Sequence, residues 1–242
     1  MKYNSTILLL VICFSTFMGC KKEEEAPYVI ERGTVSDVDG NVYETVKIGD
    51  QWWMAENLRV TKYNDGTQLA YIPVIIGEDS AWADVDSAAY CYINDTLFGC
   101  LYNAHVVNAQ KNIAPAGWHI PSDEEWKELE STLGMSDEET NQTGWRGSNE
   151  ANLLTSQYNQ GWPANDQDVG LYGSDYYGFN AKPANVRGHD GRTNTQNNSA
   201  WWWCKSSLNG DFYYRSIDTY HQRIFRQVIY PAYGMSIRCV KD

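Results

Sequence analysis

The sequence is poor in basic residues, and this shortage excludes one large class of partners. Its 242 residues include 19 lysines and arginines against 31 acidic residues, which gives a formal net charge of −12. Nucleic-acid binding needs basic patches that displace counterions from the phosphate backbone, so we expect no nucleic-acid partner. A strongly acidic chain suits a soluble body at an exposed, mostly anionic cell surface.

The common signatures of catalysis and of metal binding are also missing. The chain contains no Gly-x-Ser-x-Gly, no phosphate-binding loop, no dinucleotide fingerprint and no Cys-x-x-Cys pair, and its histidines are scattered. Asp37-x-Asp39-Gly40-Asn41 begins like a calcium loop, but Ile48 stands where the bidentate glutamate would be. We therefore expect no catalytic residue, no cofactor and no metal site.

Long apolar runs are absent, because the one strongly apolar stretch is too short to span a membrane. Residues 7–17 contain only Ser15 and Thr16 as polar residues, and a spanning helix needs about 20 apolar residues. The stretch follows Lys2 and ends at small residues. Residues 1–19 are therefore predicted to be a secretory signal peptide.

The residues after this stretch predict a lipid anchor. Gly19-Cys20 resembles a bacterial lipobox, whose cysteine is acylated, for example with palmitate, and becomes the first residue of the mature protein. Residues 20–33 then form a lipid-anchored tether held in outer-membrane lipid through Cys20. Residues 21–25, Lys-Lys-Glu-Glu-Glu, resemble the export tag of surface lipoproteins. We expect an outer membrane lipoprotein exposed on the cell surface; the alternative is one that faces the periplasm.

Cysteine is scarce once the leader and the lipobox are set aside. The four remaining cysteines allow three disulfide pairings, in a compartment that permits oxidation. Cys91 and Cys100 lie nine residues apart, and Cys204 and Cys239 fall in two predicted strands. We expect disulfides between Cys91 and Cys100 and between Cys204 and Cys239.

Local patterns predict an α+β domain with antiparallel strands, short helices and long loops. Residues 34–43 contain an Asp-Gly turn between β-type residues, which predicts a hairpin, and residues 51–55 predict a third strand. Ser122 and Glu125 form a capping box at the start of a helix that ends at Gly134. Other predicted elements are short helices at 101–110 and 148–155 and strands at 201–206, 212–217, 224–229 and 235–240.

Several motifs then follow one another in a characteristic order. They are Asp39-Gly40-Asn41-x-Tyr43, Gln51-Trp52-Trp53-Met54-Ala55-Glu56-Asn57-Leu58, Tyr63-Asn64-Asp65-Gly66, Leu101-Tyr102-Asn103, Gly117-Trp118-His119-Ile120-Pro121-Ser122-Asp123-Glu124-Glu125-Trp126, Gly178-Phe179-Asn180-Ala181, Tyr213-Tyr214-Arg215-Ser216 and Ser236-Ile237-Arg238-Cys239-Val240-Lys241-Asp242. Together they resemble the Fibrobacter succinogenes major paralogous (FISUMP) domain of Bacteroidetes-type lipoproteins, over residues 34–242. The resemblance implies a single domain, similar to the formylglycine-generating and C-type-lectin-like folds.

The resemblance implies no catalytic residue set. Formylglycine-generating relatives resemble oxidases with paired active-site cysteines, but the matching stretch, residues 213–233, contains no cysteine. An enzyme of that kind, or one acting on glycosides through two of the many carboxylates, is the less favoured alternative.

Aromatic residues point instead to recognition. Ten tryptophans and 17 tyrosines are many for this length, and both residue types stack on sugar rings and anchor interfaces. Side chains alternate along a strand, so Trp201 and Trp203 should lie on the face opposite to Trp202. The predicted ligand-binding residues are Trp145, Trp162, Tyr172, Tyr176, Tyr177, Trp201 and Trp203.

We therefore expect a non-catalytic module that binds glycans or proteins outside the cell. A structural or assembly component of the cell envelope is the competing hypothesis. Acidic residues near the aromatic ones could also hold calcium, although the lectin calcium motif is absent, and this question stays open at the level of sequence.

Overall fold

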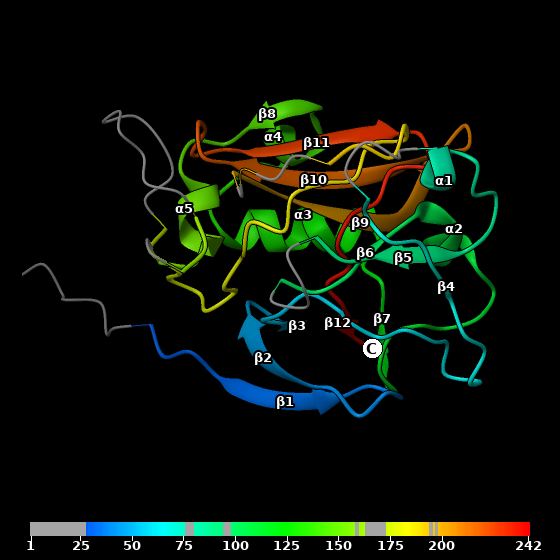
Figure 1. The fold of residues 1–242 in the computed structure, drawn as a ribbon. Helices are drawn as coiled ribbons and strands as arrows, with labels where there is room; N and C mark the ends of the chain where they lie inside the picture. Colours follow the sequence, from blue (N-terminus) through cyan, green and yellow to red (C-terminus); the bar gives the residue numbers. More distant parts are fainter. Residues whose placement is uncertain are drawn as a thin grey trace, which may run out of the picture.

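The computed structural model describes residues 28–75, 80–93, 98–157, 160–162, 173–193, 196 and 198–242. The predicted signal peptide, Cys20 and most of the tether lie outside these residues, as does Tyr172. Within them, short strands form three mostly antiparallel sheets, accompanied by a few short helices (Figure 1). This architecture agrees with the predicted α+β class.

The first sheet contains both the beginning and the end of the described chain. Its strand order is β1 (Arg32–Ser36), β2 (Val42–Ile48), β3 (Gln51–Met54), β12 (Val240–Lys241) and β7 (Trp118–His119). The hairpin between β1 and β2 is confirmed, and Gly40 adopts the positive φ of 84° that its Asp-Gly turn requires. The closing strand lies between β3 and β7, so the two ends of the domain stabilise each other.

The second sheet contains the predicted strands of the C-terminal region. Its strand order is β8 (Gly144–Arg146), β11 (Ile224–Ile229), β10 (Asp211–Asp218) and β9 (Ser199–Leu208), all antiparallel. The third sheet is small and comprises β4 (Ala70–Tyr71), β5 (Ala89–Cys91) and β6 (Leu101–Tyr102), with β4 and β5 parallel.

Two of the predicted elements differ in the structure. Residues 101 and 102 form strand β6, and the helix α2 begins only afterwards (Ala104–Asn108). The predicted strand at 235–240 is regular only at its end. Its earlier residues bond to several neighbours in turn: Met235 pairs with Tyr102, and Ser236 with Trp201 and Trp203. Because this segment passes between the sheets, its backbone cannot form hydrogen bonds with one neighbouring strand along its whole length.

The helix with the clearest start and end signals in the sequence is α3 (Asp123–Thr132), and it has the predicted capping box formed by Ser122 and Glu125. Sequence analysis missed α4 (Asp137–Asn141), although Ser136 and Glu139 form the same kind of box. The remaining helices are α1 (Ser80–Ala83), α2 and α5 (Glu150–Leu154). Of the helices that the structure describes, none is both long and apolar enough to cross a membrane.

Aromatic rings fill the space between α3 and the first two sheets. Trp126 lies 4.9 Å from Trp53 and 5.9 Å from Trp202, measured between ring centroids, and Phe179 completes the group. Beside them the fully buried guanidinium of Arg238 lies 4.2 Å above the Phe179 ring. Burial lowers the pKa of Arg238 to about 9.

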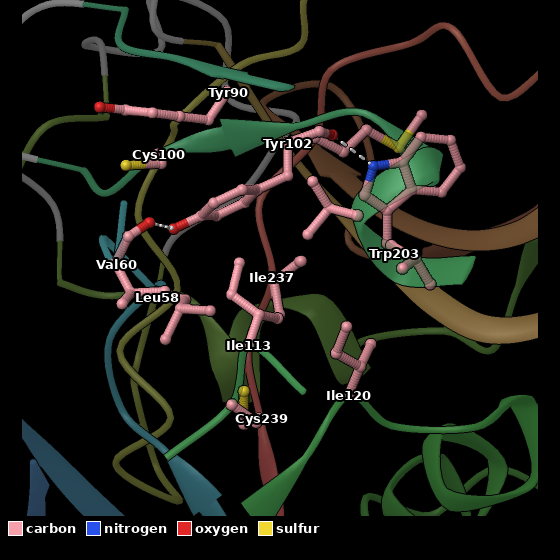
Figure 2. Packing of buried hydrophobic residues seen from close by; sticks show 14 of the residues in the cluster. Leu58, Val60, Tyr90, Cys100, Tyr102, Ile113, Ile120, Trp203, Ile237 and Cys239 are labelled. Carbon is pink, nitrogen blue, oxygen red and sulfur yellow. Dashed lines mark hydrogen bonds between the residues drawn. The ribbon is translucent and has the colours of Figure 1, made fainter. Parts of the chain in front are cut away.

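A second core cluster lies on the other side of β9. Its centre is Trp203, whose indole nitrogen donates to the carbonyl of Tyr102 at 2.7 Å, while the Tyr102 hydroxyl donates to Val60 (Figure 2). Ile237 from the closing segment packs in the same cluster. The two clusters therefore use opposite faces of β9.

An ionic network fixes α3 against the inner face of the second sheet. Glu130 of α3 accepts two hydrogen bonds of 2.7 Å from Arg146 and one of 2.6 Å from Arg215. Asp123, two turns earlier on the same face of α3, binds both Arg215 and Arg226. Burial alone would raise the pKa of Asp123, but hydrogen bonds and charge from the two arginines hold it well below the ordinary value.

Removing one partner of this network should strongly destabilise the fold. In Glu130→Ala, Arg146 and Arg215 lose their shared carboxylate while they stay buried, and we expect a loss of about 3–5 kcal/mol in the free energy of unfolding. The matched control is Glu128→Ala, an exposed glutamate on the same helix, which should change stability by about 0.5 kcal/mol or less. Urea unfolding measures both; equal losses would contradict the assigned role.

Candidate functional site

The outer face of the second sheet has a row of side chains from all four strands. Ser216 of β10 lies opposite Trp201 of β9 on one side and Phe225 of β11 on the other. Phe225 in turn lies opposite Trp145 of β8. Tyr214, two residues before Ser216, points to the same face because side chains alternate along a strand. One face of one sheet thus gathers four aromatic rings.

These rings line an open cleft of about 300 Å³. Trp201 stacks on Tyr214 with ring centroids 4.9 Å apart and planes only 14° from parallel. Trp145 stacks on His221 at 3.9 Å and meets Phe225 edge-on at 5.1 Å. The complete lining is Trp145, Asn198, Ser199, Trp201, Tyr214, Ser216, Ile217, Asp218, Tyr220 and Phe225.

The cleft combines apolar walls with a few polar groups. Burial raises the pKa of Tyr214, so its hydroxyl stays neutral. The indole nitrogen of Trp201 is buried and has no hydrogen-bond partner in the part of the chain that the structure describes. An unsatisfied buried donor is costly, but this nitrogen has almost no accessible surface and is therefore not presented to the cleft. This composition is typical of small-molecule sites, which join an aromatic lining to a few polar groups.

Two of the seven predicted ligand-binding residues, Trp145 and Trp201, come together in this cleft. Trp162 and Trp203 are core residues, because both are buried and their indole nitrogens donate to backbone carbonyls, of Ala181 and Tyr102 respectively. Trp203 shares the outer face of β9 with Trp201, as predicted. The sheet is open around Trp201, whereas Trp203 is covered by the cluster around Tyr102.

Tyr176 and Tyr177 do not line this cleft. They pack against Tyr28, with ring centroids 5.5 Å and 5.0 Å away from it, and Tyr176 is 49% exposed. Tyr172, also predicted to bind the ligand, lies outside the described residues.

Sequence analysis missed Tyr214, Phe225 and Asp218 as site residues. The alternation Tyr214, Ser216, Asp218 along β10 was the available signal, because it places all three on one face. The sequence did not indicate which face of the sheet stays open.

A larger and more polar hollow of about 370 Å³ lies elsewhere, near β2 and the segment after β3. Its charged side chains are already engaged: Arg59 pairs with Glu56 at 2.8 Å, and Lys182 donates to Gln160 at 2.6 Å. The aromatic cleft is therefore the stronger candidate site. Within the described ranges, no group of three or more His, Cys, Asp or Glu side chains is arranged to hold a metal ion.

The predicted disulfides are not formed, and all four cysteines are buried free thiols. Cys91 lies opposite Leu101 in the third sheet, so Cys100, one residue earlier, points to the other face. Cys204 lies on the α3 side of β9, whereas Cys239 packs in the cluster around Trp203. The first predicted pair thus lies on opposite faces of one sheet, and the second pair lies in two different core clusters. Burial raises the pKa of Cys91 to about 11 and of Cys100 and Cys204 to about 12.

A histidine joins the end of the chain to the start of α3. The two ring nitrogens of His119 lie 2.6 Å from Asp242 and 2.6 Å from Glu125. Burial by itself would lower the pKa of His119, but hydrogen bonds and charge from both carboxylates raise it above the ordinary value of 6.5. Since Glu125 is also part of the α3 capping box, this arrangement is structural.

The fold and the cleft define an α+β domain of mostly antiparallel sheets with an aromatic site on one sheet face. The sequence profile of the Fibrobacter succinogenes major domain matches residues 46–241. The chain belongs to this family, which confirms the resemblance seen in its motifs. None of the curated proteins and none of the solved structures compared with the chain matches it.

The four thiols should be open to alkylation once the protein is unfolded. When the protein is unfolded without reductant, N-ethylmaleimide should modify Cys91, Cys100, Cys204 and Cys239, as mapped by peptide mass spectrometry. In the folded protein at pH 8 these sites should react slowly, because burial and raised pKa values suppress the thiolate. Labelling that needs prior reduction would show that disulfides exist.

His119 gives a prediction on the pH dependence of stability. The pKa of His119 is raised in the folded state. The stability that its two carboxylate contacts contribute is therefore fully present below pH 6.5, and it is lost as pH rises through the native pKa. We expect the free energy of unfolding to fall over that window in the parent protein and to stay flatter in His119→Gln. Parallel pH profiles for the two proteins would refute the prediction.

Proposed function

We propose that this protein is a non-catalytic recognition module that binds glycans in the aromatic cleft of its second sheet. The observation that carries the proposal is the row of side chains from Trp201 to Trp145, which crosses four strands and lines an open cleft. Pyranose rings present flat C–H surfaces that stack on aromatic faces, and Trp and Tyr add a polar group at the edge of the ring.

The polar groups of the cleft complement a sugar as well. The lining also includes the hydroxyl of Tyr214 and the carboxylate of Asp218, which are groups of the kind that bind sugar hydroxyls. Because these groups lie on strands of an extended sheet, the site is largely preformed. Preformed sites lose little conformational entropy when a ligand binds.

The cellular setting that we propose follows from the sequence. Acylated Cys20 anchors the protein in outer-membrane lipid, and the domain is displayed at the cell surface; the alternative is a domain facing the periplasm. For the fold, we propose a C-type-lectin-like arrangement. It is supported by the capped start of α3 and by the return of the closing segment to the first sheet, the two features that carry the resemblance.

Removing either of two aromatic faces should weaken binding. The probes are soluble oligosaccharides, first cellohexaose and chitohexaose, titrated against the purified protein while its tryptophan fluorescence is followed. Trp145→Ala and Trp201→Ala should each raise the Kd at least about tenfold, a loss of about 1.4 kcal/mol. The matched aromatic control is Tyr230→Ala, since Tyr230 is 61% exposed and does not line the cleft.

Urea unfolding of each variant separates lost binding from lost folding. A saturable response that survives Tyr230→Ala but not the two tryptophan changes supports the proposal. If a broad glycan panel gives no response, the glycan hypothesis fails, and an assembly role in the envelope takes its place. The strand edge of β1, which pairs only with β2 in the described sheet, would then be the surface to test.

A further inference from the structure

One charged side chain lines the aromatic cleft, and it is acidic. Asp218 ends β10 next to Tyr220, and no lysine or arginine is present among the described lining residues. The whole chain is acidic too, with a formal charge of −12. The local and the overall field therefore favour positive charge in this cleft.

The carboxylate of Asp218 has one oxygen in use and one available. Its Oδ1 accepts from the backbone N–H groups of Tyr220 and His221, both at 2.9 Å, and from His221 Nδ1 at 2.8 Å. No residue that the structure describes donates a hydrogen bond to Oδ2. The side chain keeps 23% of its surface exposed, so Oδ2 can receive a ligand donor. The three bonds on Oδ1 hold the carboxylate in a fixed orientation.

The aromatic rings favour the same kind of charge. The faces of Trp145, Trp201, Tyr214 and Phe225 carry the negative part of the ring quadrupole, which attracts cations. A carboxylate at the rim of such a group of rings is the usual complement of an ammonium group. A neutral sugar would use only the stacking part of this site.

We infer that the glycan bound by this cleft carries a free amino group, so that its ligand class is the amino sugars, such as glucosamine oligomers. This inference rests on the proposed function. The apolar face of the sugar ring stacks on the aromatic side chains, and the ammonium group binds Asp218 Oδ2. Acidic sugars are disfavoured, because a second carboxylate would lie near Asp218.

The test compares three oligosaccharides that share one β-1,4-linked backbone. Cellohexaose has a hydroxyl at C2, chitohexaose has an N-acetyl group, and the glucosamine hexamer has a free amine. We expect the glucosamine hexamer to bind at least about tenfold more tightly than the other two at low salt. This advantage should shrink as salt is added, since screening weakens an exposed ion pair.

Asp218→Asn should remove the preference and leave stacking intact, so all three oligosaccharides should then bind alike. The matched control is Asp211→Asn, which removes the same charge from the same strand at a residue outside the cleft. Trp145→Ala should weaken all three ligands, because it removes stacking.

The outcomes separate this inference from the proposed function. Equal binding of the three oligosaccharides by the parent protein overturns the inference and leaves glycan recognition in place. The glucosamine hexamer could also bind tightly to the parent protein and lose the same affinity in Asp218→Asn and in Asp211→Asn. Equal losses would indicate general attraction to an acidic surface, and they would also overturn the inference. If none of the three binds, both proposals fail. The comparison of ligands on the parent protein remains decisive even if Asp218→Asn does not fold.

Discussion

The structure depends on the buried ionic network between α3 and the second sheet. Asp123 and Glu130 approach from the helix, and Arg146, Arg215 and Arg226 approach from three strands. Buried charges are tolerated only when they are fully paired, so the helix has few acceptable positions on the sheet. Because this network and the tryptophan cluster occupy the inner face, the aromatic side chains of alternate residues are directed to the outer face. The position of the candidate site therefore follows from which side chains the core requires on the inner face of the second sheet.

Coverage of the outer face is uneven, and this unevenness creates the cleft. Near Trp203 the face is closed by the cluster that contains Tyr102, the hydroxyl of which bonds to Val60 (Figure 2). Around Trp201 and Trp145 the rings are only partly covered, and a cleft of about 300 Å³ remains. The same strand thus contributes one tryptophan to the core and one to the surface. A site of this kind needs no separate recognition loop, because the sheet itself presents the rings.

The chain belongs to the Fibrobacter succinogenes major domain family, and its motifs now have structural reasons. Asn57, from the Gln-Trp-Trp-Met-Ala-Glu-Asn-Leu motif, accepts hydrogen bonds from Trp202 and from Arg238 of the closing motif. Glu125, from the motif at the start of α3, caps that helix and binds His119. The residues of these motifs mainly form contacts that hold distant segments of the chain together. The residues of the cleft, apart from Tyr214 and Ser216, lie outside the motifs.

Local sequence patterns were enough to predict the Asp-Gly hairpin before β2, the capped start of α3 and the alternating strands of the C-terminal region. These depend on neighbours a few residues apart, so short patterns suffice to predict them. The sequence also indicated that Trp201 and Trp202 face opposite sides. Tertiary structure decided which of these sides is covered and which strands become neighbours. Cys91 and Cys100 show the difference, because they are close in the sequence, but the pairing of Cys91 with Leu101 places the two thiols on opposite faces of the third sheet. The cleft likewise required Trp145 and Trp201 to meet across β10 and β11, a contact between distant segments that only the packed sheet establishes.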